Sequence, residues 1–167
     1  LQLSGQRNAT GFSYNAASQA QTLFASAAYP LIDRSKRNEP ALLWVPAARW
    51  VATPTQAVAV NAQALDLVPT GQPGQFMVSF NGLALPKAKV QIVAPSGWSR
   101  EAQSDEQGRV NFALPWKGLY VAEVHHSDKQ GGEAQGKRYG EASYVTTLSF
   151  NVKDGMPSPA LPSAAKP

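Results

Sequence analysis

The chain has 167 residues, of which 43% are hydrophobic and only 16% charged, with 13 Gly, 13 Pro and no Cys. This composition excludes a coiled coil or long helical bundle, disulfide bonds and thiolate chemistry, and it favours a turn-rich β protein. The net charge is +4, and residues of both signs are interspersed along the chain. Its only dense basic cluster, Arg34, Lys36 and Arg37, is flanked by Asp33 and Glu39, which indicates a solvated loop and not the basic stripe of a nucleic-acid-binding protein. No apolar run approaches the ~18 residues of a membrane span.

Residues 1–40 are polar, small and weakly patterned, and we expect an irregular N-terminal segment there. Two local structures fit it: a short helix over 15–29 capped by Asn15, or a strand at 10–15, where aromatic and polar residues alternate. The chain begins at Leu1 without a basic and apolar leader. We therefore expect that a targeting segment has been removed or that the chain has been trimmed.

From residue 41 the pattern is typical of an antiparallel β-sandwich, which we place at 41–153. Apolar and polar side chains alternate in several short segments, each bounded by turn-forming residues. Asp105 and Gly108 are expected to form the tip of a hairpin with Gly108 at positive φ, and Gly118 to allow a bend into the core. The alternation predicts one buried cluster between two sheets, formed by Val90, Ile92, Val110, Phe112, Tyr120, Val124, Leu148 and Phe150.

The two ends of this region carry further signals. The apolar run at 42–45 is expected to stop at Pro46. Residues 154–167 contain four Pro and little that can pack, which predicts an extended tail or linker. Trp98 and Trp116 both lie beside turns. Packing at the sheet edge and partial exposure with a binding role are both open for them.

Three strings in the chain resemble a known fold. They lie at 81–90 with its Asn-Gly and Leu-Pro pairs, at 104–112 with Ser-Asp-Glu-Gln-Gly, and at 117–121 with Lys-Gly-Leu-Tyr-Val. In this order and spacing they are similar to the prealbumin-like or carboxypeptidase-regulatory-like β-sandwich. The resemblance implies an immunoglobulin/prealbumin-like arrangement of antiparallel sheets.

Further strings at 65–69, 95–98 and 132–150 extend the similarity over about residues 41–152. They look like a poorly characterised exported bacterial family related to the NikM-like periplasmic components of nickel and cobalt uptake. The resemblance implies a periplasmic location and an association with metal uptake. Members of that family typically begin with a His close to a Trp and a Pro, whereas this chain has no His before residue 125, so no metal ligands are carried over.

The only two histidines, His125 and His126, are the candidate imidazole ligands. If one strand runs through both, they point to opposite faces and a single metal cannot easily take both. If the strand ends before them, a bent loop brings either one near Asp128, Glu133 or Glu141. Such a set of nitrogen and carboxylate ligands suits nickel, cobalt, copper or zinc. The alternative is a pair of surface histidines at the end of a strand.

The polar loop at 127–143 is long for a hairpin and contains four Gly, which serve either the close approach of a ligand or flexibility. Lys137, Arg138, Tyr139 and Glu141 are its candidate ligand-contacting residues. A solvated charged turn explains them equally well.

Enzyme classes find little support in the motifs. The chain has no Gly-x-Ser-x-Gly elbow, phosphate loop or dinucleotide pattern, and it lacks the Tyr-Arg-Gly-Ser ending of prealbumin-like hydrolases. We therefore expect a non-enzymatic periplasmic binding or accessory protein linked to transition-metal uptake, with a transition metal as the only candidate cofactor. The alternative is an interaction module that docks by a sheet edge or by its Pro-rich tail onto an envelope protein or membrane transporter.

Overall fold

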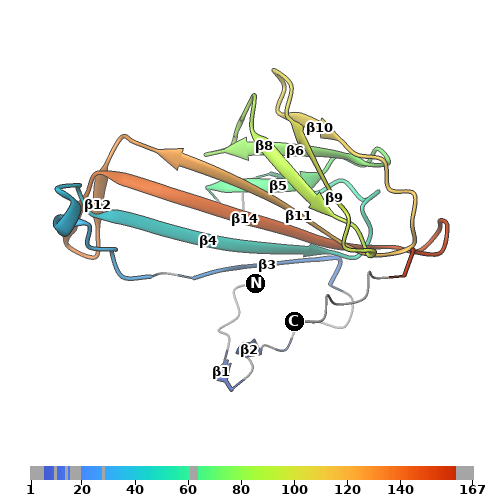
Figure 1. Ribbon diagram of the computed structural model, residues 1–167, viewed down its shortest axis with the longest axis horizontal. Coiled ribbons are helices and arrows are strands. Elements are labelled where there is room, and N and C mark those ends of the chain that lie inside the picture. The colour runs from blue at the N-terminus through green and yellow to red at the C-terminus, as the bar shows by residue number, and fades with distance from the viewer. Residues whose placement is uncertain are drawn as a thin grey trace, which may run out of the picture.

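The computed structural model describes residues 6–9, 11–13, 15, 20–27, 29–60 and 64–160. Two facing β-sheets form a sandwich in this part of the chain, which confirms the expected all-β class (Figure 1). The larger sheet has six strands in the order β3 (Thr22–Ser26), β4 (Leu42–Val51), β14 (Glu141–Val152), β11 (Gly118–Asp128), β8 (Lys89–Val93) and β9 (Ser99–Gln103). The smaller sheet has the order β10 (Arg109–Asn111), β6 (Gln75–Phe80) and β5 (Leu65–Pro69), with β7 (Leu83–Ala84) also paired to β6.

Shorter elements complete the described part. β1 (Gln6–Asn8) pairs with β2 (Gly11–Ser13), β12 (Gly132–Ala134) pairs with β13 (Lys137–Tyr139), and η1 (Ser35–Arg37) is one turn of 3-10 helix. No helix within the described ranges has the length and apolar character to cross a membrane.

The N-terminal segment agrees with one of the two expectations made for it and differs from the other. β2 falls within the strand expected at 10–15, but the helix expected over 15–29 is not formed at 22–26, where β3 pairs antiparallel with β4. Residues 16–19 lie outside the described part. The larger sheet therefore begins before residue 41, because β3 supplies a strand that the weak local pattern did not indicate.

The predicted core is confirmed. All eight residues named from the alternation are buried in one cluster with residues of both sheets. Stacking of Phe150 between Phe76 and Tyr120, with ring centroids 5.3 and 5.7 Å away, joins β14 to a strand of the opposite sheet and to its own neighbour β11. The period-two pattern places these side chains inward on every strand they come from.

The turn at 105–108 forms as predicted, but its place in the fold differs. Asp105 Oδ1 accepts hydrogen bonds from the backbone N–H groups of Gln107 and Arg109, and Gly108 has φ +73°. The flanking strands, however, pair with different partners: β9 pairs with β8 in the larger sheet and β10 pairs with β6 in the smaller one. The turn is therefore a crossing between the sheets and not the tip of a hairpin.

The expected stop at Pro46 is wrong, since β4 runs through it. The Pro46 carbonyl accepts a hydrogen bond from the Ala27 N–H, so the backbone of Pro46 faces the side of β3. β3 itself ends at Ser26, opposite Ala47. The missing N–H of Pro46 therefore lies beyond the ladder and removes no strand-to-strand bond. β4 pairs in parallel with β14 over ten residues, the one parallel ladder among the described strands.

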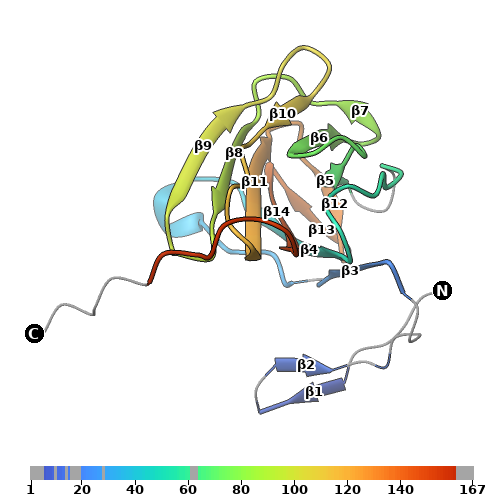
Figure 2. The same cartoon turned by 90° about the vertical axis from the view of Figure 1, so that its right-hand side faces the viewer.

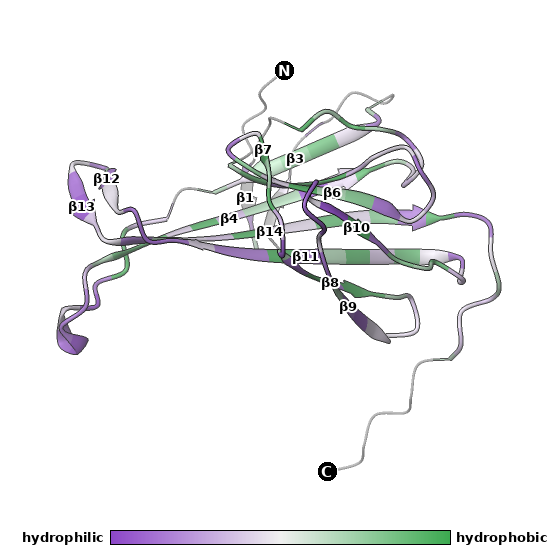
Figure 3. Ribbon diagram, turned by 90° about the horizontal axis from the view of Figure 1, so that it is seen from above, coloured by the Kyte–Doolittle hydropathy of each residue, from purple (hydrophilic) through white to green (hydrophobic). Residues whose placement is uncertain are grey.

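Three strands of the larger sheet outrun the smaller sheet. β4, β11 and β14 have 10, 11 and 12 residues, whereas β5 and β6 opposite them have 5 and 6. Beyond the sandwich these strands continue as an extension that we call the distal arm, with the connections 29–41 and 129–140 at its end (Figures 1 and 3). The predicted site residues from Asp128 to Glu141 belong to this arm, whereas His125 and His126 lie earlier on β11, where His126 packs against Phe80 of the smaller sheet.

Candidate functional site

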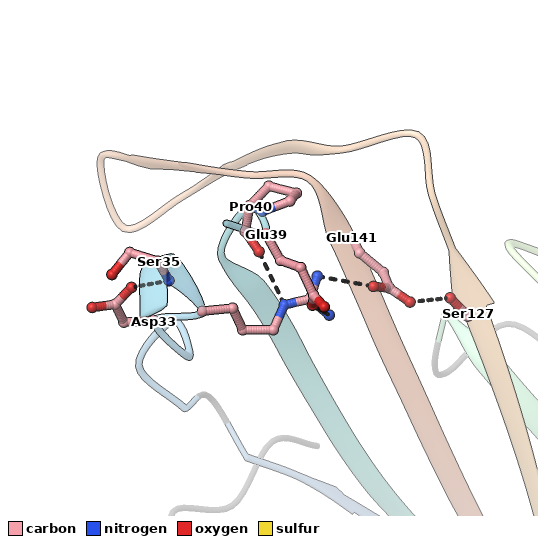
Figure 4. A network of polar contacts seen from close by, with 7 residues as sticks. Asp33, Ser35, Glu39, Pro40, Ser127 and Glu141 are labelled. Carbon is pink, nitrogen blue, oxygen red and sulfur yellow. Dashed lines mark hydrogen bonds and ion pairs between the residues drawn. The ribbon is translucent and has the colours of Figure 1, made fainter. Parts of the chain in front are cut away.

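Arg34 is the centre of a polar network at the end of the distal arm (Figure 4). Its Nε donates to the carbonyl oxygen of Pro40 at 3.0 Å, its Nη2 lies 2.9 Å from Glu141 Oε2, and its Nη1 lies 3.1 Å from Glu39 Oε2. The Arg34 side chain is 18% exposed. One guanidinium thus closes its own loop and fastens that loop to the start of β14, 107 residues away.

Glu141 receives a second donor on its other oxygen. Ser127 Oγ donates to Glu141 Oε1 at 2.6 Å, which links β11 to β14 at the last pairs of their ladder (Figure 4). The hydrogen bond from Ser127, followed by that from Arg34, holds the pKa of the Glu141 carboxyl below its ordinary value. Both oxygens of the Glu141 carboxylate therefore have partners within the chain, and the side chain serves to hold the arm together.

A local turn shapes the loop that carries Arg34. The backbone N–H of Ser35 donates to Asp33 Oδ1 at 2.8 Å, and this bond lowers the pKa of Asp33. Aspartate commonly makes such a turn because its short side chain reaches the N–H two residues later. The turn starts η1 and leaves the Lys36 and Arg37 side chains exposed.

The loop predicted at 127–143 is shorter and more ordered than expected. β11 continues to Asp128 and β14 begins at Glu141, and the hairpin β12–β13 lies between them. Gln135 and Gly136, at φ +54° and +72°, form its two-residue turn. A side chain at Gly132 would collide with the Tyr139 ring opposite it, because an added Cβ would lie 2.5 Å from the tyrosine oxygen.

Gly140 brings the two connections of the arm together. Its N–H donates to the Ala41 carbonyl at 3.0 Å, and an added Cβ would lie 2.4 Å from Pro40 Cγ. Gln135 Nε2 also donates to the Tyr29 carbonyl at 3.3 Å. Of the two roles open for glycine in this loop, the close approach at Gly140 is made, but to the chain's own backbone and proline.

The two histidines point to opposite faces of β11, as expected for one strand running through both. His125 Nε2 lies 2.7 Å from Glu123 Oε1 on the outer face, and its side chain is 63% exposed. His126 lies on the inner face, where its ring packs against Phe80 with centroids 4.4 Å apart. Phe80 also contacts Tyr144, whose pKa is raised by burial. One histidine has a carboxylate partner and the other belongs to an aromatic cluster.

The acidic candidates do not join them. Asp128 Oδ1 accepts the backbone N–H of Gln130 at 2.9 Å, and Glu133 lies opposite Arg138 in the β12–β13 ladder. Within the described residues no three His, Asp or Glu side chains form a group able to hold a metal ion. The structure thus does not bring the predicted set of His125, His126, Asp128 and Glu133 into one site.

The basic residues of the arm are placed differently from its acids. Lys36 and Arg37 project from η1, Lys129 follows β11, and Lys137 and Arg138 lie on β13. All five are exposed, and none forms an ion pair with another part of the described chain. Figure 3 shows the two connections diverging at the end of the arm, each with a stretch coloured as hydrophilic. We call these five residues the cationic tips.

Residues 33–39 and 128–141 together contain six Lys or Arg and five Asp or Glu, so the net charge of the arm is small. The separation of charge is the informative feature. Two of the acids, Glu39 and Glu141, converge on Arg34, and two more, Asp33 and Asp128, close local turns. Of the predicted ligand-contacting residues, Lys137 and Arg138 are therefore available at the surface, while Glu141 is engaged and Tyr139 is half-buried.

Sequence reasoning missed Arg34, Glu123 and Phe80 as neighbours of the site. Glu123 and His125 are two residues apart, so the period of a strand already placed them on one face. No local signal pairs Arg34 with Glu141 or Phe80 with His126, because those contacts depend on how distant strands meet. Comparison of the chain with protein-family models, curated proteins and solved structures gives no match. The resemblance to the NikM-like family therefore stays a hypothesis.

Proposed function

We propose that this chain is a non-enzymatic interaction module of the bacterial periplasm, which docks onto an acidic surface of an envelope or membrane-transport partner through its distal arm. The observation that carries the proposal is the set of five cationic tips on two connections. The arm ends beyond the sandwich, so a partner can reach the cationic tips on both connections without displacing the core (Figure 1).

The way in which the backbone of the two connections is held supports this proposal. The Arg34 network and the Gly140 contact fix both connections to the ends of β4, β11 and β14. Connections whose backbone is already held in place lose less conformational entropy on binding than mobile loops. Rim charges of this kind chiefly steer association and select partners by complementary potential.

A metal-holding role for the chain itself has less geometric support. The His125–Glu123 pair offers two ligands, whereas structural and catalytic zinc sites use three or four protein ligands. A link to nickel or cobalt uptake, which rests on the resemblance, would then act through the transporter to which the module docks.

Site-specific photo-crosslinking in the native envelope tests the proposal. A photoreactive residue in place of Asn38 or Gln135, beside the two tips, is expected to capture one discrete partner. The same residue in place of Glu106, in the exposed turn of the sandwich, is the matched control and is expected to give no such adduct. The adduct should disappear when Lys36, Arg37, Lys137 and Arg138 are changed to Glu. Equal adducts from Glu106, or an adduct that survives charge reversal, would contradict docking through the tips.

A further inference from the structure

Two tryptophans, of which Trp98 is exposed and Trp116 half-buried, form an aromatic corner at the end of the sandwich opposite the distal arm. Trp98 is 62% exposed, and its ring meets that of Trp116 edge to face with centroids 5.9 Å apart. Met156, 57% exposed, lies beside Trp116 through a parallel β-bridge. We call Trp98, Trp116 and Met156 the tryptophan corner. A large exposed indole is costly in water, and a patch of such residues marks an interaction site.

The corner is built on fixed backbone. Pro95, in the turn before Trp98, packs against Gly118, which has φ +128° and where an added Cβ would lie 2.8 Å from Pro95 Cγ. Gly118, where a bend was expected, thus lets Pro95 approach the start of β11 closely. The indoles are therefore held by the scaffold and not by a flexible loop.

The C-terminal segment is fastened to the same corner. The Met156 N–H donates to the Pro115 carbonyl at 2.9 Å, and the Lys117 N–H donates to the Met156 carbonyl at 3.0 Å. Gly155, at φ +155°, permits this approach, since an added Cβ would lie 2.8 Å from the Pro115 oxygen. Figure 2 shows the segment after β14 passing the ends of β8 and β9 before it leaves the sandwich. The tail thus departs from a defined point.

The sequence beyond Met156 has the spacing of a polyproline ligand. It reads Pro-Ser-Pro-Ala-Leu-Pro over 157–162, so Pro159 and Pro162 are three residues apart. Polyproline II has three residues per turn, so two prolines at this spacing would share one face in that conformation, and aromatic-lined grooves bind such segments. Residues 155–165 contain no charged side chain, so this face can enter an apolar site without desolvating a charge.

We propose that the tryptophan corner binds the Pro159–Pro162 segment of a second copy of this chain. The tail cannot easily serve its own corner. Each proline fixes its own φ and keeps the preceding residue extended, so the chain cannot fold back soon after Met156. At ~3.1 Å per residue, an extended path would carry Pro159 about 9 Å beyond Met156. Since every copy carries one corner and one tail, reciprocal exchange closes a two-fold pair.

Sedimentation velocity of the full chain tests this proposal. The concentration range of about 5 to 500 µM brackets a dimer dissociation constant of ~100 µM. We expect concentration-dependent dimers for the wild type and for Trp50→Ala, which removes a partly exposed tryptophan elsewhere on the larger sheet. Dimerisation should weaken at least about tenfold, or ~1.4 kcal/mol, in Trp98→Ala and in the Pro159→Ala, Pro162→Ala double variant. Circular dichroism checks that each variant folds. If Trp98→Ala does not fold, the Pro159→Ala, Pro162→Ala variant still tests the proposal.

A mixture of the two defective variants gives the sharper result. Trp98→Ala retains an intact tail and the double proline variant retains an intact corner, so mixing restores one of the two contacts. Mixed dimers should form more readily than homodimers of either variant. A chain that stays monomeric at every concentration, dimerisation that is equal in all variants, or a mixture that shows no gain would each overturn the proposal. Neither variant changes a cationic tip, so photo-crosslinking at the distal arm is unaffected by the outcome.

Discussion

Arg49 and Asp66 form a bidentate ion pair that joins the two sheets of the sandwich. Arg49 Nε and Nη2 lie 3.1 and 2.9 Å from the two carboxylate oxygens, and the side chains are 2% and 0% exposed. Arg49 also donates to Thr22 Oγ1 on β3, and the Phe24 ring lies 5.6 Å from the guanidinium carbon. One buried arginine on β4 thus connects β3, in its own sheet, to β5 in the opposite sheet.

Removal of one partner of this pair should be costly. Asp66→Ala leaves the Arg49 charge buried without its carboxylate, and we expect a loss of about 3–5 kcal/mol in the free energy of unfolding. The double variant Arg49→Met, Asp66→Leu should recover most of that loss, because an apolar pair needs no charge compensation. Urea denaturation of the wild type and both variants measures the difference. A double variant as unstable as Asp66→Ala would show that the loss comes from packing and not from the unpaired charge.

Truncation of Phe112 should open a cavity in the core. Phe112 directly follows β10, and its ring centroid lies 6.5 Å from that of Phe76 in the core cluster. We expect Phe112→Ala to lower the free energy of unfolding by about 3–5 kcal/mol. Leu83→Ala, at a 74% exposed leucine on β7, is the control and should change stability by less than ~0.5 kcal/mol.

Gly108 should tolerate substitution far less well than its neighbour in the same turn. Its φ is +73°, and an added Cβ would lie 2.5 Å from the Val78 carbonyl oxygen. Gly108→Val should therefore destabilise the fold by at least about 1–3 kcal/mol, whereas the exposed Gln107→Ala should be nearly neutral. Thermal unfolding followed by circular dichroism compares the two. Equal effects would contradict the turn geometry.

The stability of the distal arm should depend on the ionisation of Glu141. The hydrogen bonds from Ser127 and Arg34 lower the pKa of Glu141 in the folded chain. The ionised carboxylate therefore contributes fully to stability above the ordinary carboxyl pKa of 4.5. The contribution is lost as the pH falls through the lowered pKa, where the carboxylate becomes protonated. In Ser127→Ala the pKa of Glu141 should rise toward its ordinary value. Titration of the Glu141 side-chain carboxyl by ¹³C NMR measures this change, and Ser143→Ala, which has no bond to Glu141, should leave it unaltered.

Metal titration should separate docking from metal binding by the chain. We expect nickel, cobalt, copper and zinc to bind the wild type and the His125→Ala, His126→Ala variant with the same weak affinity, because the two imidazoles point to opposite faces. Calorimetry at neutral pH provides the measurement, because protons compete with metal ions for imidazole nitrogen at lower pH. One saturable micromolar site that the double variant loses would restore the metal hypothesis.

The core and the turns could be read from the sequence because their signals are local. Val90 and Ile92 face inward for the same reason that Lys89 and Gln91 face outward: successive side chains of a strand alternate. Gly108 follows from turn chemistry within four residues. These features depend chiefly on neighbours in the chain.

Features set by distant strands were not accessible in this way. The sequence alone determined that the chain is all-β, which side chains its core buries, and that one strand through His125 and His126 would separate them. Only the tertiary structure decided that β4 runs past Pro46, that the turn at 105–108 crosses between sheets, and that Arg34 reaches Glu141. Alternation and turn geometry are properties of a few consecutive residues, whereas the pairing of strands and the meeting of side chains 107 residues apart depend on the packing of the whole chain.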